Sequence, residues 1–401
     1  MSQPTRPQAG LLSAAVLISL CLLVATTSAG TERRYVKTKQ GDRPMPIVAI
    51  DNVCAWPNLT VLGDGTIIAT IFNRPSHGKS AGDVDCWASK NGGRSWRRRG
   101  TPAPHEPDAT RMNVAAGRAK NGDLIVISSG WSNKYPPEKK GPPFRAGILE
   151  SWVCRSSDGG SQWSIDKRAF PSRGPRGGDC IPFGDIVRGN DGTLRVAIYE
   201  VIDLRDDRVW LFRSRDDGRT WGEPVVLDEN AYRNETALLH LGGGRWLAAI
   251  RENGLHLHAS ADDGKTWEHR MRLTGPDQHP GHLLRLRSGR ILLAYGNRTP
   301  NAKGVDVRWT DDEGKTWSAS VRVLDFQGDG GYPSSVQLPD GQVVTAYYAR
   351  KIESHDRYHM GVVIWDPVRT LPKVIAAKSE SARKRKKIGR IPLLDVPATA
   401  Q

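Results

Sequence analysis

Apolar and polar residues alternate in short segments along most of the chain, and one arrangement of them occurs six times. Each copy consists of an apolar segment, a polar turn that ends in glycine, and a second apolar segment. Two apolar segments joined by such a turn are typical of an antiparallel hairpin. No segment between residues 31 and 375 has a sustained helical period. The pattern therefore predicts an all-β protein, with turn glycines at Gly65, Gly122, Gly192, Gly244, Gly289 and Gly341.

A second repeat of eight residues occurs five times and alternates with the first. It has Asp or Asn at its third position, Gly at its fifth and Trp at its eighth. The Asp or Asn side chain caps a tight turn, the glycine supplies a positive φ, and the Trp packs beneath the turn. These acidic residues are therefore expected to be structural. The repeat ends at Trp96, Trp163, Trp221, Trp267 and Trp317.

Each interval between turn glycines therefore holds four antiparallel strands, and the Trp-containing turn joins the last two of them. Six such units predict a six-bladed β-propeller. The sixth unit lacks the Trp-containing turn. Its third strand is expected at residues 360–365, and residues 46–50, from the other end of the chain, are expected to supply its outer strand.

The two ends of the chain differ from this pattern. An apolar run at residues 11–25, followed by small residues, predicts a signal peptide over residues 1–29 and a secreted or periplasmic protein, free of the membrane after cleavage. The propeller is expected over residues 31–372, and residues 373–401 are expected to form a basic, disordered tail. The formal net charge is +15, and this tail carries eight Lys and Arg against two acidic residues. The basic balance of the remainder does not by itself indicate a nucleic-acid partner.

The sequence offers no sign of a metal or cofactor. No cluster of His, Cys, Asp and Glu has the spacing of metal ligands, so neither is expected. Four cysteines follow the predicted cleavage site without a Cys-x-x-Cys spacing, and they are expected to be structural, either buried or paired: Cys54, Cys86, Cys154 and Cys180.

The register of the repeats predicts which side chains converge at one mouth of the propeller. Nine residues before each turn glycine lies one equivalent position at the start of the innermost strand, occupied by Trp56, Asn113, Phe183, Glu235, Pro280 and Tyr332. Glu235 and Tyr332 carry reactive groups, and Arg251 and Arg298 follow at the ends of second strands. Further candidates near this mouth are His77 and Asp83 in the loop of the first unit, and Arg111 before the first strand of the second.

These repeats and residues resemble the sialidase superfamily over about residues 31–370, and the Trp-containing turn resembles its Asp-box. The resemblance implies that Tyr332 is a nucleophile activated by Glu235, and that Asp83 is the general acid and base, with His77 as a second candidate. A neutral Tyr suits a sugar whose carboxylate repels an anionic nucleophile. Arg251 and Arg298 would bind that carboxylate through planar guanidinium groups.

One departure from the family bears on specificity. The family's first carboxylate-binding arginine is replaced by Ala55, in the stretch Cys54-Ala55-Trp56-Pro57. We expect an exo-acting glycoside hydrolase that acts on an acidic sugar of a glycoprotein, glycolipid or polysaccharide. Arg111 and Asn113 are expected to contact this substrate, and Trp56 to stack against it. The alternatives are a polysaccharide lyase or non-sialic glycosidase acting on uronate-bearing glycans, and a non-catalytic glycan-binding propeller.

Overall fold

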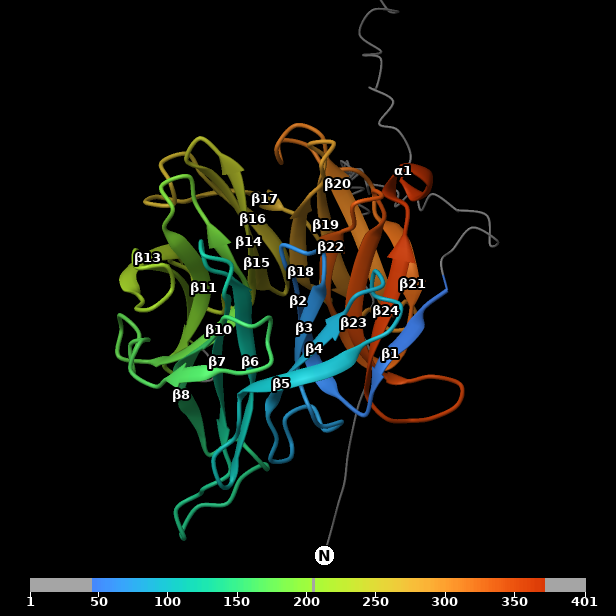
Figure 1. Ribbon diagram of the computed structural model, residues 1–401. Helices are drawn as coiled ribbons and strands as arrows, with labels where there is room; N and C mark the ends of the chain where they lie inside the picture. The colour runs from blue at the N-terminus through green and yellow to red at the C-terminus, as the bar shows by residue number, and fades with distance from the viewer. Residues whose placement is uncertain (1–44, 204–205, 372–401) are drawn as a thin grey trace, which may run out of the picture. The chain divides into compact units, whose positions relative to one another are not determined.

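The computed structural model describes residues 45–203 and 206–371 of the chain (Figure 1). The predicted signal peptide and the predicted basic tail lie outside the described residues. The described part consists of strands β1 to β24 and one short helix, α1 (Pro367–Thr370). The predicted all-β class is confirmed.

The first three four-stranded units follow one another along the chain, and in each the strands pair antiparallel with their sequence neighbours. We call the units blades and number them in chain order. Blade one contains β2 (Cys54–Val61), β3 (Ile67–Phe72), β4 (Val84–Ser89) and β5 (Arg97–Ala103). Blade two contains β6 (Ala109–Arg118), β7 (Leu124–Ser132), β8 (Gly147–Ser156) and β9 (Ser164–Asp166). Blade three contains β10 (Asp179–Arg188), β11 (Leu194–Val201), β12 (Asp207–Ser214) and β13 (Gly222–Asp228).

The remaining units repeat this arrangement, except that the last draws strands from both ends of the described chain. Blade four contains β14 (Thr236–Gly242), β15 (Arg245–Glu252), β16 (Gly254–Ser260) and β17 (Glu268–Arg272). Blade five contains β18 (Gln278–Arg285), β19 (Ile291–Asn297), β20 (Gly304–Thr310) and β21 (Val321–Asp325). Blade six contains β22 (Gln327–Gln337), β23 (Val343–Lys351), β24 (His359–Trp365) and β1 (Ile47–Asp51).

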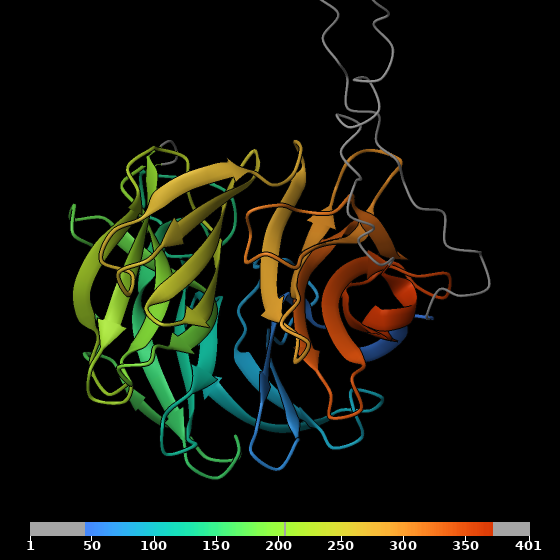
Figure 2. The same cartoon turned by 90° about the horizontal axis from the view of Figure 1, so that it is seen from above.

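The first strands of the blades form a closed ring. Each of β2, β6, β10, β14, β18 and β22 contacts the next, and β22 contacts β2. Parallel pairing of β6 with β10 joins blades two and three into one eight-stranded sheet. Blade six closes the ring, because β1 pairs antiparallel with β24 from Ile47 opposite Val362 to Asp51 opposite His359. Figure 2 shows this blue N-terminal strand beside the red C-terminal strands. The predicted β-propeller is therefore confirmed.

Four of the five Trp-containing turns share one set of hydrogen bonds, which the last copy illustrates, and the turn at Asp216 differs in that Trp221 Nε1 has no partner among the described residues. Asp312 Oδ1 accepts hydrogen bonds from the backbone N–H of Thr316 at 2.9 Å and from Thr310 Oγ1 at 2.7 Å. Thr310 Oγ1 accepts one from the N–H of Gly314, which has a φ of 91°, and Trp317 Nε1 donates to the carbonyl of Gly314. The acidic residue of this turn is therefore engaged in holding the hairpin.

The apolar core lies between neighbouring blades, because each face of an inner strand packs against the blade next to it. In β3, Ile67 and Ile71 point to one side and pack against Val344 of blade six. Ile68 points to the other side and packs against Leu124 of blade two. Alternation of side chains along a strand therefore places apolar residues on both faces of this sheet.

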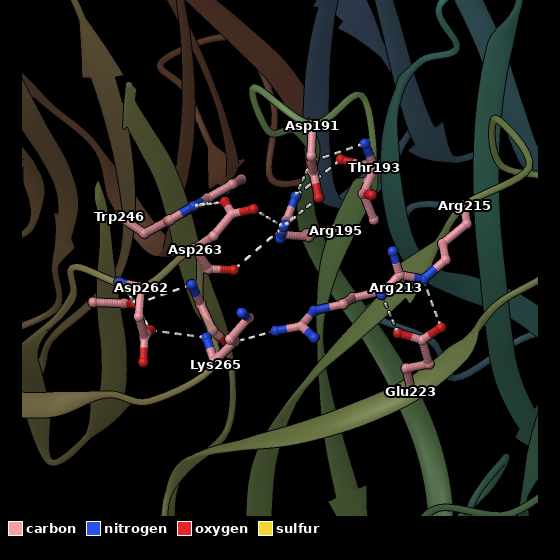
Figure 3. A network of polar contacts seen from close by, with 12 residues as sticks. Asp191, Thr193, Arg195, Arg213, Arg215, Glu223, Trp246, Asp262, Asp263 and Lys265 are labelled. Carbon is pink, nitrogen blue, oxygen red and sulfur yellow. Dashed lines mark hydrogen bonds and ion pairs between the residues drawn. The ribbon is translucent and has the colours of Figure 1, made fainter. Parts of the chain in front are cut away.

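Polar contacts also join neighbouring blades, and the network between blades three and four is an example (Figure 3). Arg195 of β11 is only 2% exposed. Its guanidinium donates to Asp263 Oδ2 at 2.6 Å and to Asp191 Oδ1 at 3.1 Å. Trp246 Nε1 donates to the other carboxylate oxygen of Asp263 at 2.9 Å. A buried charge paired on both sides in this way ties one blade to the next.

The four cysteines of the described residues are buried free thiols. Burial raises the pKa of Cys86, Cys154 and Cys180 to about 12. A neutral buried thiol packs as a small apolar side chain. The expectation of structural cysteines agrees with this burial, and no disulfide links these four residues.

Candidate active site

Three of the predicted site residues meet in one hydrogen-bonded triad. Glu235 precedes β14 and lies beside Arg251 of β15, whose N–H donates to the Glu235 carbonyl across the hairpin at 3.2 Å. Tyr332 Oη donates to Glu235 Oε1 at 2.7 Å. Arg251 Nη1 donates to Glu235 Oε2 and, at 3.0 Å, to Tyr332 Oη. The repeat register therefore predicted this convergence of blades four and six correctly.

The backbone at Tyr332 is locally irregular. The pairing of β22 with β23 shifts register between Gly331 and Ser334, and Tyr332 has a φ of 54°. A left-handed backbone at a bulky residue is unusual, and such strain concentrates at functional sites. The side chain is 5% exposed, and Trp56 stacks on it with ring centroids 4.5 Å apart. The bulge and the stacked ring together hold the phenol against Glu235.

The electrostatics of the triad keep the phenol neutral. Burial and the charge of Glu235 raise the pKa of Tyr332, and the charges of Arg251 and Arg298 offset this only in part. Desolvation lowers the pKa of Arg251, but the neighbouring Glu235 and Tyr332 outweigh it and raise that pKa. The arrangement is thus a protonated phenol that donates to a carboxylate, with a cationic guanidinium bound to both.

Arg298 reaches the same place from blade five. Its Nε donates to the carbonyl of Gly330 at 3.0 Å, and its Nη2 donates to Tyr348 Oη at 3.0 Å. Nη2 also pairs with Asp329 at 3.2 Å, and the guanidinium carbon lies 5.1 Å from the centre of the Tyr332 ring. Two of the predicted arginines therefore flank Tyr332, each paired with a carboxylate.

His77 and Asp329 form a second reactive pair near the triad. His77 Nδ1 lies 2.7 Å from Asp329 Oδ2, which also accepts hydrogen bonds from Tyr358 at 3.0 Å and Tyr348 at 3.2 Å. The His77 ring lies 5.3 Å from that of Trp56. Within the described part of the chain His77 Nε2 makes no hydrogen bond, and the side chain is 29% exposed. Nε2 is therefore available to a bound molecule.

Asp329 remains ionised beside this histidine. Burial raises its pKa, but the hydrogen bond and charge of His77, together with the charge of Arg298, outweigh this and lower it to about 2. A carboxylate on Nδ1 fixes the orientation of an imidazole. The pair is thus built to present Nε2 in a defined direction.

Asp83, the other candidate acid and base, is engaged away from the triad. Its Oδ1 lies 2.5 Å from His105 Nδ1 and accepts the His105 backbone N–H at 2.8 Å, while Oδ2 accepts from Asn73 Nδ2 at 3.0 Å. Burial raises the pKa of Asp83, but the bonds from His105 and Asn73 outweigh this and lower it. Its carboxylate holds the β3–β4 loop.

The two predicted substrate-contacting residues of blade two do not join the triad. Arg111 is 1% exposed, its Nε donates to Glu106 at 2.9 Å, and its guanidinium lies 3.6 Å from the centre of the Trp152 ring. Asn113 is buried, and its amide donates to Ser129 Oγ at 3.4 Å. Arg111 is thus bound to the β5–β6 connection and to β8, and Asn113 to β7.

Several further residues border the site, and two of them, Asp329 and Asp207, were not predicted from the sequence. Asp329 stands three residues before Tyr332 on β22, where regular alternation would place it on the opposite face, but β22 shifts register between Gln327 and Gly330 and again between Gly331 and Ser334. His279, at the start of β18, is held neutral because burial and the charges of Arg251 and Arg298 lower its pKa to about 3. Asp207, which binds the Asn234 amide at 3.2 Å, has its pKa raised chiefly by burial. The fold brings His279 and Asp207 close to Arg251.

Among residues 45–203 and 206–371, no group of three or more His, Cys, Asp or Glu side chains is placed to hold a metal ion. None of the helices in the same residues is long and apolar enough to cross a membrane.

The chain belongs to the family of BNR repeat-like domains, whose model matches residues 65–345. No curated protein matches the sequence. Among solved structures, a protein of unknown function from Dyadobacter fermentans is 24% identical, with a TM-score of 0.67 over 80% of this chain and 98% of that one. A Hadza microbial sialidase is 18% identical, with a TM-score of 0.61 over 80% and 67% of the two chains.

A mutant of the NanB sialidase from Streptococcus pneumoniae is 13% identical, with a TM-score of 0.63 over 80% of this chain and 70% of that one. Identities this low establish a shared fold and leave activity open. The resemblance of the sequence to the sialidase and BNR-repeat superfamily is therefore confirmed at the level of the fold.

Proposed function

We propose that the protein is an exo-acting glycoside hydrolase that releases an acidic sugar from a glycan through a tyrosine nucleophile. The observation that carries this proposal is the triad of Glu235, Tyr332 and Arg251. A buried phenol that donates 2.7 Å to a carboxylate is the arrangement of a nucleophile with its base. A purely glycan-binding propeller has no need for such a pair.

In the first step Glu235 takes the proton of Tyr332 Oη as that oxygen attacks the anomeric carbon. The bond to the leaving sugar breaks, and the leaving oxygen receives a proton from His77 Nε2. Arg251, which already donates to Tyr332 Oη at 3.0 Å, stabilises the negative charge that develops on the phenol oxygen. The product of this step is a glycosyl-tyrosine.

In the second step a water molecule attacks the anomeric carbon, and His77 Nε2 removes its proton. The bond to Tyr332 breaks, and the phenol oxygen recovers its proton from Glu235. Two displacements at one carbon return its original configuration. The sugar leaves with one added water, and every protein group ends in its starting protonation state.

His77 is preferred over Asp83 as the acid and base because of its hydrogen bonds. Asp83 already accepts from three donors, one from Asn73 in its own loop and two from His105 in the β5–β6 connection. His77 has one ring nitrogen held by Asp329 and the other available, and its ring lies beside Trp56, which stacks on the nucleophile. A general acid has to lie within reach of the proton that it transfers.

The proposal is tested with Tyr332→Phe, which removes only the attacking oxygen. Mass spectrometry of products from sialylated and uronate-containing oligosaccharides should show a free acidic sugar with one added water for the parent protein. Tyr332→Phe should lower that release by several orders of magnitude at an unchanged unfolding midpoint. Release of the sugar by Tyr332→Phe at the parent rate would contradict the nucleophile assignment.

A uronate lyase is the second candidate, and Ala55 is the observation that favours it. Without an arginine at this position, a carboxylate that sits elsewhere on the ring could be accepted. His77 would then remove the proton from the carbon beside the carboxylate, and the neutral phenol of Tyr332 would protonate the leaving oxygen. The same mass spectra separate the two, because a lyase product is unsaturated and carries no added water.

A further inference from the structure

Arg145 lies at the edge of the site, in the loop that joins β7 to β8. This loop connects the second and third strands of its blade, as does the β3–β4 loop that carries His77, and both extend in the same direction from the ring (Figure 1). A Cβ built on Gly78, the neighbour of His77, would lie 3.8 Å from Arg145 Nη1. Arg145 therefore borders the loop that presents the histidine.

The contacts of Arg145 fix its position without neutralising its charge. The guanidinium carbon lies 4.5 Å from the centre of the Trp131 ring, and Nη1 donates to the carbonyl of Phe144 at 2.6 Å. Phe144 is buried with a φ of 53°, which anchors the end of the loop. Among the described residues Arg145 has no carboxylate partner, whereas Arg251 and Arg298 each have one.

Arg145 consequently adds to the edge of the site a guanidinium that no carboxylate of the described residues balances. Glu235 balances Arg251, and Asp329 lies between His77 and Arg298. Arg145 is solvent-exposed, yet desolvation by the surrounding protein lowers its pKa, and the opposing influence comes from Tyr199 and Tyr135. A guanidinium that is partly desolvated and unpaired gains most from an anion that accepts two parallel hydrogen bonds.

Blade one has Ala55 where an anion-binding arginine was expected from the family resemblance. Ala55 is fully buried and packs with Cys54, Phe72 and Met112 beneath the mouth. Its methyl group can donate no hydrogen bond to a ligand. Trp131, on which Arg145 stacks, packs against the same apolar cluster as Ala55 and Tyr332, so the guanidinium that borders this side of the site comes from blade two.

We propose that Arg145 binds the anionic substituent of the substrate sugar, a carboxylate or a sulfate, in place of the arginine that blade one lacks. The inference rests on the proposed function in one respect only, namely that the pocket around Tyr332 accepts a sugar. It does not depend on which group is the nucleophile. It assigns substrate specificity to a residue of blade two, whereas Ala55 lies in blade one.

The test measures binding separately from turnover. In the Tyr332→Phe background, isothermal titration calorimetry is performed with N-acetylneuraminic acid, glucuronic acid, a sulfated galactose and neutral N-acetylglucosamine. Arg145→Gln removes the charge, Arg145→Lys keeps it without the planar fork, and Arg97→Gln removes a matched exposed charge on the outer strand of blade one. Unfolding midpoints of all variants should agree, because these side chains are exposed.

Arg145→Gln should weaken binding of one acidic probe about 10- to 100-fold, Arg145→Lys by less, and Arg97→Gln should not change it. Loss confined to the sulfated probe would identify the substituent as a sulfate, and loss confined to the carboxylates would identify a carboxylate. The inference would be overturned if the Arg145→Gln and Arg97→Gln variants bound the acidic probes with equal affinity. It would also be overturned if the protein with Arg145 intact bound only the neutral sugar. If Tyr332→Phe keeps full turnover, the proposed mechanism fails while the binding result still decides the role of Arg145.

Discussion

Replacing Asp329 with Asn tests the assignment of His77 most directly. The substitution keeps the size of the side chain and removes its charge. Asp329 Oδ2 now lies 2.7 Å from His77 Nδ1 and accepts from Tyr358 at 3.0 Å. An amide cannot offer two anionic oxygens, so the imidazole loses the charged group that orients it. Arg298 loses its carboxylate partner in the same variant.

The size of the effect follows from that hydrogen bond. A hydrogen bond to a charged group contributes about 1.5–3 kcal/mol. Each 1.36 kcal/mol of transition-state stabilisation changes a rate tenfold, so Asp329→Asn should lower kcat/KM about 10- to 150-fold where proton donation limits the first step. His77→Gln removes the acid itself and should cost about 100- to 10,000-fold.

The assay compares two leaving groups on the same acidic sugar. A sugar leaving group, as in sialyllactose, needs a proton to depart, whereas para-nitrophenolate departs without one. Because kcat/KM reports the first irreversible step, Asp329→Asn and His77→Gln should lower it for the first substrate and scarcely change it for the second. Effects through Arg298 on binding alter both substrates alike, so they cancel in the ratio.

Two results would refute this reasoning. Equal losses on both substrates would mean that Asp329 acts through binding or packing and that His77 is not the acid. A leaving-group-dependent loss in Asp83→Asn, with none in His77→Gln, would return the role to Asp83. Tyr332→Phe serves as the reference, since it should abolish turnover of both substrates.

Three further predictions concern stability and reactivity. Asp312→Ala should lower the free energy of unfolding by about 1–2 kcal/mol through loss of the turn bonds, with the exposed Lys315→Ala unchanged in denaturant titrations. Burial raises the pKa of Asp228, but hydrogen bonds from His258 and Arg233 outweigh burial and lower that pKa. The stabilisation from Asp228 is therefore full above the unfolded pKa of about 4 and is lost as the pH falls below it. Asp228→Asn should weaken this loss of stability at low pH, and an unchanged dependence of stability on pH would contradict the assignment. Cys154, whose pKa burial raises to about 12, should resist thiol reagents in the native protein and react after unfolding; rapid native labelling would count against its burial.

The fold could be predicted from the sequence because two local signals repeat. The turn glycines and the Trp-containing turns mark hairpins that depend on near neighbours, so counting them gave the blades and their order. The position of β1 beside β24 also followed, because an incomplete last blade needs a partner strand. Glu235, Tyr332 and Arg251 could be placed at one mouth for the same reason: they share positions in the repeat.

The remaining site residues depend on distances that no repeat encodes. Whether Asp83 or His77 turns its side chain toward the mouth is decided by neighbours outside the repeat, such as His105 in the β5–β6 connection, which binds Asp83. Arg111 was placed near the mouth by its position in the sequence, but Glu106, five residues earlier in the β5–β6 connection, pairs with it. Arg145 lies in a long loop with no repeat pattern, so its approach to Gly78 appears only in the folded chain.

The pairing of β1 with β24 determines when the ring can close during synthesis of the chain. Ile47 pairs with Val362, 315 residues later in the chain, so blade six cannot form until Val362 has been synthesised. At roughly 5–20 residues per second on the ribosome, that wait is about 15–60 seconds. Loop closure over so long a separation is entropically costly and slow, and until it happens the edge of blade one and the lone strand β1 remain open to pairing with other chains. Among the described strands, β24 is the last to be synthesised, and its pairing with β1 completes the ring. We therefore expect nascent chains that end before β24 to aggregate.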